Sequence, residues 1–293
     1  MTAWGQARPR PTFLRPALVA VAALVAAAAW AGGPAELDAQ APSVQSDHPW
    51  CDAQRGRPWL QRRCEVHEIA LTAPGGPLEV DAGLNGGIEV RAWDRDELLL
   101  VARLEAQAEE PRAAAALLDS MRVVTSGHRV RVEAPEPSAE EWASSDFLLY
   151  VPEQSALRLT TLNGNIRVTG VHGALLLESR NGGIELAAVG GEVRGRTSNG
   201  GLHLILEGLR WIGDGLTLST VNGGATIIVP ADYSAVLHAS TIRGHLDIDG
   251  LPLECDPPGG GCASRRVRGP LGAGGALVRV SSENGGVRIS HGR

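Results

Sequence analysis

Few side chains in this sequence have the types and spacing that chemistry needs, and the densest acidic group is the first candidate. It consists of Asp247, Asp249, Glu254 and Asp256. Asp247 and Asp249 are two residues apart, so on a strand they would share a face and offer carboxylate oxygens to Ca²⁺. An ordinary solvated strand and loop accounts for the same residues, and we favour that interpretation. The sequence therefore predicts neither a metal site nor a cofactor.

The sequence contains no recognisable catalytic motif. No pattern of a nucleophile elbow, a zinc protease, an EF-hand or a phosphate-binding loop occurs, and His67-Glu68 lacks the second histidine of a zinc-binding helix. Glycoside hydrolysis needs two carboxylates that flank one bond, whereas Glu178, Glu185 and Glu192 fall at different positions of the repeat described below. We expect a protein that is not an enzyme, and the alternative is a polysaccharide-active enzyme.

The chain holds four cysteines, Cys51, Cys64, Cys255 and Cys262. An even number of cysteines in an exported chain is typical of disulfide bonds, and four cysteines allow three pairings. We favour the local pairing, which joins Cys51 to Cys64 and Cys255 to Cys262. Neither pair has Cys-x-x-Cys spacing, which argues against a zinc site.

Export is predicted from the first 41 residues, which resemble a secretory signal peptide. Arginines precede an apolar run from 17 to 31, and small residues follow, so cleavage is expected after Ala31 or Ala41. The run is short for a membrane span, and a retained N-terminal anchor is the alternative. We expect no integral membrane domain beyond this segment, and a location in the periplasm, at the cell surface or outside the cell.

The elements that must position any site are indicated by a turn motif that occurs six times. The motif is Asn-Gly, then Gly or Asn, then an apolar residue. Its Asn-Gly pairs are Asn85-Gly86, Asn163-Gly164, Asn181-Gly182, Asn199-Gly200, Asn222-Gly223 and Asn284-Gly285. A repeated turn followed by a repeated strand is typical of a stacked architecture.

Each repeat is expected to contain two short strands with one buried face. Apolar residues alternate with polar ones and align every 18 residues at 163, 181 and 199, in columns such as Ile166, Ile184 and Leu202, or Leu175, Val193 and Trp211. Asn and Gly accept positive φ, which would suit them to the turns. Asn-Gly is also typical of β-hairpins, but hairpins would not keep the turn and both columns in register. We therefore predict a single-chain coil whose stacked Asn side chains form a hydrogen-bonded ladder.

Three segments interrupt the repeat. The insert 109–122 is predicted to be a helix, and the strands 98–105 and 128–133 on either side of it are expected to pair. About five residues are inserted near 209–214, because Asn222 follows Asn199 by more than one period. The segment 251–275 is rich in Pro and Gly and is predicted to be a loop.

This ordered set of features resembles the bacterial putative-adhesin family of β-strand-repeat domains, which are found in cell envelopes. Besides the tetrads, the resemblance rests on 89–96, 109–132, 151–156 and 229–235. It covers residues 65–293 and implies a right-handed β-helix-like solenoid and an envelope location, but it brings no catalytic residues. The cysteine loop 251–262 departs from the family pattern and leaves the order of the last repeats open.

We therefore predict an all-β protein in three parts: the signal peptide or anchor 1–41, an exported lead segment 42–64, and a single β-solenoid domain 65–293. The net charge of −6 argues against nucleic-acid binding. Outward positions such as Arg167, Glu185 and His203 have mixed charge and suit a polar partner.

The leading functional hypothesis is an adhesin-like binding or scaffold protein whose partner is a glycan or another envelope protein. A third possibility is an envelope-stress regulator that binds its partner through the helical insert. Exposed tryptophans would favour a glycan, since aromatic rings stack on sugars, whereas buried ones would fill the ends of the coil. We favour burial for the group Trp50, Trp59, Trp93, Trp142 and Trp211.

Overall fold

The computed structural model describes residues 43–52, 57–73, 75–253, 255 and 265–292. All described residues belong to one compact unit within Pro34–Arg293. The predicted signal peptide and Cys262 lie outside the described residues, so export by cleavage and the Cys255–Cys262 bond stay predictions. No helix among the described residues is long and apolar enough to cross a membrane.

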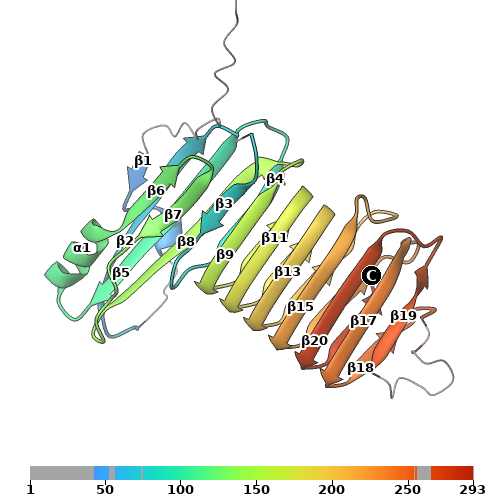
Figure 1. Cartoon of the computed structure of the whole chain (residues 1–293). Helices are drawn as coiled ribbons and strands as arrows, with labels where there is room; N and C mark the ends of the chain where they lie inside the picture. Colours follow the sequence, from blue (N-terminus) through green and yellow to red (C-terminus); the bar gives the residue numbers. More distant parts are fainter. Residues whose placement is uncertain (1–42, 53–56, 74, 254, 256–264, 293) are drawn as a thin grey trace, which may run out of the picture. The chain divides into compact units, whose positions relative to one another are not determined.

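The described unit is all-β and consists of two large mixed sheets that do not close (Figure 1). Sheet A contains, in spatial order, β1 (Ser43–Gln45), β2 (Gln61–Leu71), β5 (Leu98–Ala108), β8 (Trp142–Pro152), β4 (Ile88–Trp93), β10 (Ile166–Thr169), β12 (Ile184–Ala187), β14 (Leu202–Ile205), β16 (Ala225–Val229), β21 (Val287–His291) and β18 (Leu246–Asp249). Sheet B contains β19 (Arg266–Leu271), β17 (Ala235–Arg243), β20 (Leu277–Asn284), β15 (Gly215–Asn222), β13 (Gly190–Asn199), β11 (His172–Asn181), β9 (Leu157–Asn163), β3 (Leu78–Asp81), β7 (Arg129–Glu133) and β6 (Arg122–Ser126).

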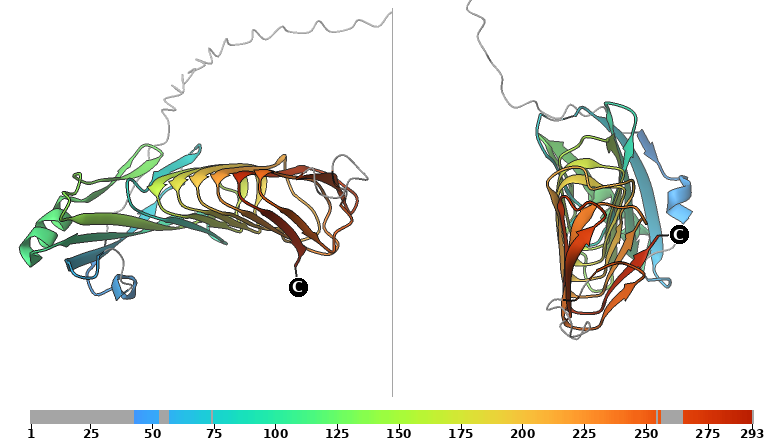
Figure 2. Two further views of the ribbon diagram at one scale, coloured as in Figure 1. Left: turned by 90° about the horizontal axis from the view of Figure 1, so that it is seen from below. Right: turned by 90° about the vertical axis from the view of Figure 1, so that its right-hand side faces the viewer.

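Equivalent strands of successive repeats pair with one another in parallel. Ile166 lies opposite Ile184 in sheet A, and Leu175 lies opposite Val193 in sheet B. The tetrads are therefore not β-hairpin turns, which would join antiparallel strands. The two sheets face each other (Figure 2). Their inner faces share one apolar core, as expected when alternate residues of each strand are buried.

One predicted column is wrong at its last member. Val193 lies opposite Leu216, not opposite Trp211. The inserted residues lie between β14 and β15, where Trp211 is buried and its indole Nε1 donates a hydrogen bond to the Gly191 carbonyl at 3.1 Å. An insertion displaces the period of the sequence, but the Asn199–Asn222 register resumes after it.

The strands that flank the helical insert do not pair with each other, contrary to the prediction. β5 lies between β2 and β8 in sheet A, whereas β7 lies between β6 and β3 in sheet B. The helix itself is α1 (Pro111–Ser120), whose Leu117 and Leu118 pack against Leu104 and Ala106 of β5. Hydrophobic packing at this end of the sheets decides which strands β5 and β7 pair with. The local sequence pattern does not specify pairing between segments that are distant in the chain.

The last strands do not follow chain order. β20 and β21 lie between the pair β15 and β16 and the pair β17 and β18, although they come last in the sequence. Part of the segment predicted as a loop, 251–275, forms β19 instead. This strand pairs antiparallel with β17 and so supplies hydrogen-bond partners to an edge that would otherwise be unpaired.

The tetrad glycines serve close stacking, which differs from the role expected for them. None of these glycines or asparagines is among the residues with positive φ. A Cβ atom on the first glycine of each tetrad would lie between 1.6 and 2.2 Å from a backbone carbonyl oxygen, which belongs to Ser145 of β8 for Gly86 and to the neighbouring turn for the others. Glycine is therefore needed because adjacent backbones approach too closely for any side chain.

Candidate functional site

The tetrads form two hydrogen-bonded ladders along one edge of the sheets. Each Asn side-chain amide donates to the Oδ1 of the preceding Asn at 2.7–3.0 Å, from Asn284 through Asn222, Asn199, Asn181 and Asn163 to Asn85. The guanidinium of Arg243 donates to Asn284 Oδ1 at the other end of this ladder. Two residues before Arg243 and before each Asn except Asn85, a buried Ser or Thr donates to a tetrad glycine carbonyl at 2.6–3.0 Å; these are Thr161, Ser179, Thr197, Thr220, Thr241 and Ser282. Both ladders hold the turns in file.

Beside this edge, the outer face of sheet A is hollowed. Two hollows, of about 570 and 890 Å³, share Asn165, and together we call them the sheet A groove. Part of the floor of the groove is formed by glycines, which have no side chains: Gly183, Gly201, Gly224 and Gly286. The groove thus runs across neighbouring strands from β4 to β18.

A row of polar side chains forms one wall of the groove. Its members lie opposite one another on successive strands: Glu89, Arg167, Glu185, His203, Thr226, Arg288 and Asp247. The guanidinium of Arg167 contacts Glu185 at 2.7 Å, and that of Arg288 contacts Asp247 at 3.1 Å. Opposite charges across strands therefore balance much of this wall.

One end of the groove is aromatic. Trp50 and Trp142 both line it, and Trp142, Ser144 and Asp146 share the outer face of β8. Ser144 is buried, and within the described part of the chain its Oγ has no hydrogen-bond partner. Asp146 Oδ1 accepts a hydrogen bond from the Gly87 backbone at 2.9 Å. This end therefore combines two aromatic rings with a buried hydroxyl.

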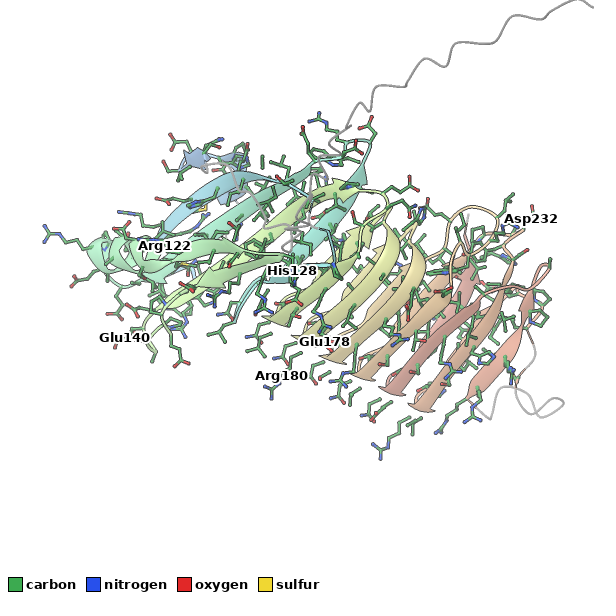
Figure 3. The ribbon with its side chains drawn as sticks, turned by 45° about the horizontal axis from the view of Figure 1, so that its top comes forward. Arg122, His128, Glu140, Glu178, Arg180 and Asp232 are labelled. Atoms are coloured by element: carbon green, nitrogen blue, oxygen red, sulfur yellow. A yellow bond between two sulfur atoms is a disulfide. The ribbon has the colours of Figure 1, made fainter. Side chains whose placement is uncertain are left out.

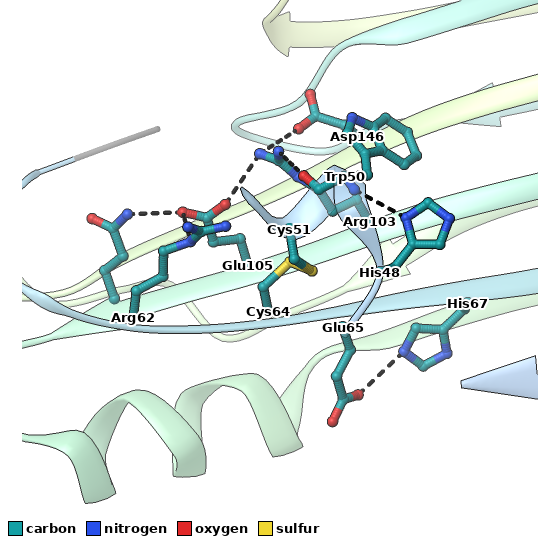
Figure 4. Close-up of a disulfide and its surroundings, with 11 residues drawn as sticks. His48, Trp50, Cys51, Arg62, Cys64, Glu65, His67, Arg103, Glu105 and Asp146 are labelled. Carbon is teal, nitrogen blue, oxygen red and sulfur yellow. Dashed lines mark hydrogen bonds and ion pairs between the residues drawn. A yellow bond between two sulfur atoms is a disulfide. The ribbon is translucent and has the colours of Figure 1, made fainter. Parts of the chain in front are cut away.

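Trp50 is held in place by the lead segment, as Figure 4 shows. Cys51 and Cys64 form a disulfide between η1 (Pro49–Asp52) and β2, as predicted. Beneath them, the buried guanidinium of Arg103 lies 3.1 Å from both Glu105 and Asp146 and donates to the Trp50 carbonyl at 3.0 Å. A disulfide of this kind is typical of proteins outside the reducing cytoplasm.

The predicted carboxylates do not converge on one site. Glu178 points away from sheet B into solvent beside Arg180 (Figure 3), and Glu192 pairs with Arg194 at 2.6 Å. Asp247 and Asp249 are exposed on β18, where Asp247 pairs with Arg288. Among the described residues, no group of three or more His, Cys, Asp or Glu side chains is placed to hold a metal ion.

Shifted pKa values occur at three of the described residues, Arg91, Glu79 and Tyr233. On β4, the hydrogen bond that Arg91 donates to Glu89 raises the pKa of Arg91. The hydrogen bond from Arg129 lowers the pKa of Glu79. Burial raises the pKa of Tyr233 to about 12. None of the three produces a proton donor or acceptor suited to catalysis near neutral pH.

The tryptophans differ in exposure, so the expectation of burial holds only in part. Trp211 is buried, whereas Trp59 is 73% exposed. Sequence reasoning missed the joint role of Trp142, Ser144 and Asp146, although their spacing of two in a strand was a usable signal. It also missed the Ser/Thr column, which the recurring Ser/Thr-x-Asn-Gly pattern could have indicated.

Three solved structures are similar to this chain at low identity. A putative cell adhesion protein from Clostridium sporogenes matches over 80% of this chain and 100% of its own, with 9% identity and a TM-score of 0.38. A putative adhesin from Bacteroides fragilis matches over 77% and 96%, with 11% identity and a TM-score of 0.38. A putative lipid binding protein from Parabacteroides distasonis matches over 78% and 97%, with 11% identity and a TM-score of 0.28. No protein-family profile and no curated protein matches the sequence. At these low scores the likeness carries no argument about function.

Proposed function

We propose that this chain is an exported, non-enzymatic, adhesin-like protein that binds a glycan chain along the sheet A groove. The observation that carries the proposal is the pair of adjoining hollows that extends from β4 to β18, with Trp50 and Trp142 lining one of them. Extended grooves on stacked strands suit extended ligands. Aromatic rings can stack on sugar faces while amides and hydroxyls bind sugar hydroxyls.

The wall of the groove favours a neutral glycan. Arg167 pairs with Glu185 and Arg288 pairs with Asp247, so little unbalanced charge faces a ligand. The carboxylate of Asp146 is already engaged by Arg103 and the Gly87 backbone. Binding without turnover is therefore the function that these contacts support best.

The finer architecture is part of the same proposal. Parallel register at 18 residues in both sheets supports a right-handed β-helix-like solenoid for 65–293, entered through the lead segment 42–64. The Cys51–Cys64 bond supports a location in the periplasm, at the cell surface or outside the cell. Residues 1–41 would then act as the signal peptide or anchor.

The test is glycan binding by two tryptophan variants. We expect at least one of the neutral probes chitohexaose, cellohexaose and maltohexaose to bind the chain in isothermal titration calorimetry. Trp142→Ala should weaken that binding about tenfold, since a stacked ring contributes on the order of 1 kcal/mol. Trp59→Ala is the matched control, because Trp59 is exposed and does not line the groove.

Either of two results would overturn the glycan proposal. One is that none of the three probes binds the wild-type chain. The other is that Trp59→Ala weakens binding as much as Trp142→Ala, because the loss would then not come from the groove.

A further inference from the structure

Backbone amides on the floor of the sheet A groove form a row of hydrogen-bond donors. They belong to the third residue of each tetrad, which recurs at the same place in neighbouring repeats. At two of these places a side chain accepts the hydrogen bond: Asp146 Oδ1 lies 2.9 Å from the Gly87 nitrogen, and Asn165 Oδ1 lies 2.8 Å from the Gly183 nitrogen. The acceptor residue lies directly across from the glycine on the neighbouring segment of sheet A. These N–H groups therefore point along the stack toward a place that an external oxygen atom can also occupy.

The next three amides of the row have no such acceptor. They belong to Gly201, Gly224 and Gly286, and the residue across from each on the preceding segment is itself a glycine. Within the described part of the chain, no group accepts a hydrogen bond from these three amides. All three glycines are exposed and line the larger hollow of the groove. The hollow thus offers a ligand three donors about 4.8 Å apart, which is the spacing of neighbouring strands.

We propose that these amides bind the acetamido carbonyl groups of a glycan built from N-acetylhexosamines. This inference rests on the proposed function and names the class of glycan. The side-chain carboxamide of Asn165 is the chemical equivalent of an acetamido group, and its oxygen already accepts the corresponding hydrogen bond in its own repeat. Where the preceding residue is glycine, the space that the Asn165 side chain fills in its repeat is left to the ligand.

The surroundings favour a neutral acceptor over a carboxylate. Glu185 and Asp247 line the same hollow as the three amides. An anionic ligand would place its charge beside these two carboxylates, whereas an amide carbonyl accepts the same hydrogen bonds without that repulsion. The row therefore selects acetamido groups over uronic acid carboxylates.

The first experiment compares chitohexaose with cellohexaose in isothermal titration calorimetry. Both are β-1,4-linked chains, and they differ in the acetamido group that replaces one hydroxyl of each sugar. We expect chitohexaose to bind at least about tenfold more tightly, because more than one net amide–carbonyl hydrogen bond separates the two ligands.

The outcomes of this comparison separate the inference from the proposed function. Equal affinities for the two hexaoses would overturn the acetamido inference and leave the groove as a glycan site. Tighter binding of hexagalacturonate than of chitohexaose would overturn it too, since the row would then take carboxylates. If neither these ligands nor maltohexaose bind, the proposed function fails as well.

The variant Gly201→Asn blocks one donor from within the chain. A Cβ at Gly201 would meet only the Gly224 carbonyl oxygen, at 3.5 Å, which is an ordinary contact. The new side chain would take the place that Asn165 has in its repeat, and its Oδ1 should accept from the Gly224 amide. We expect a loss of about fivefold in chitohexaose affinity, the value of one net hydrogen bond. Gly201→Ala is the matched control, because it adds the same Cβ without an acceptor and should keep the preference for chitohexaose. An equal loss in both variants would contradict the donor role of the amide.

Amide proton NMR of the wild-type chain gives a measurement that does not depend on any variant. Chitohexaose should move the amide proton signals of Gly201, Gly224 and Gly286 downfield, as a hydrogen bond to a carbonyl oxygen does. The signal of Gly183 should move little, because its N–H group is already bonded to Asn165. Chitohexaose binding that leaves the three signals unmoved would overturn the inference, because the acetamido groups would then bind elsewhere.

Discussion

At the residue scale, glycine sets the distance between neighbouring backbones. The first glycine of each tetrad lies so close to the next strand connection that a methyl group cannot be placed there. The Asn and Ser/Thr ladders then join the same turns through side-chain hydrogen bonds. The repeated Asn-Gly pair therefore reflects stacking, which explains why positive φ is not required.

The matching prediction is that Gly182→Ala destabilises the fold strongly. The added Cβ would lie 2.0 Å from the Gly164 carbonyl oxygen, and the rigid backbone there cannot move without breaking its own strand pairing. We expect a loss of about 3 kcal/mol in the free energy of unfolding, measured by urea denaturation. Gly75→Ala is the control, because nothing lies within 4 Å of a Cβ at Gly75. Equal stability of the two variants would contradict the stacking argument.

At the element scale, the lead segment acts as a cover over part of sheet A. Its short helix η1 carries Trp50 and Cys51 over the outer face of β5, where Arg103 and Glu105 are fully buried. Such a cover keeps the buried ion pair away from water. Exposing part of the network, or removing one partner, would change the balance between the desolvation cost of the charges and their mutual attraction. The same cover places one ring at the end of the groove.

We therefore predict that Cys51→Ser/Cys64→Ser weakens both stability and glycan binding. Removing the disulfide should cost about 2–3 kcal/mol, because the loop it closes is short, and should free Trp50 from its place in the groove. Urea denaturation and calorimetry measure the two effects. Asp52→Asn, a neighbouring change outside the bond, should leave both unchanged. A double variant with wild-type affinity would show that Trp50 does not contribute to the groove.

At the scale of the described unit, the strands that come last in the sequence lie inside the two sheets and not at their edges. β20 and β21 separate β15 and β16 from β17 and β18, so the last strands connect segments that come earlier in the chain. The segment 235–249 has no direct pairing with 215–229. Its strands are therefore connected to the rest of the stack through β20 and β21.

The corresponding prediction concerns a chain that ends after Ala276. It lacks β20 and β21 but keeps β17, whose parallel partner is then missing. We expect the amides of β17 to lose protection in hydrogen exchange, whereas those of β11 keep it, because β17 would then pair only with β19 and an isolated two-stranded unit opens easily. Ending the chain after His291 is the control and should preserve all protection. Protected β17 amides in the shorter chain would mean that β17 pairs with β15 instead.

The sequence by itself determined the local features of this protein. Alternating apolar residues marked the strands such as Ile166–Thr169 and Ile184–Ala187, the tetrads marked the turns, and the insert held a helix at Pro111–Ser120. These signals can be read because strand alternation, helical spacing and turn chemistry depend on residues close together in the chain. The Cys51–Cys64 pairing could be predicted for the same reason.

Only the tertiary structure decided which distant segments meet. It assigned Arg167 to the groove on sheet A and Arg194 to the outer face of sheet B. It also placed β20 between β15 and β17 and brought Trp50 beside Trp142. Strand order and site assembly follow from the burial of whole faces and from pairing between distant edges. Local pattern does not encode these, because several orders would bury the same alternating residues.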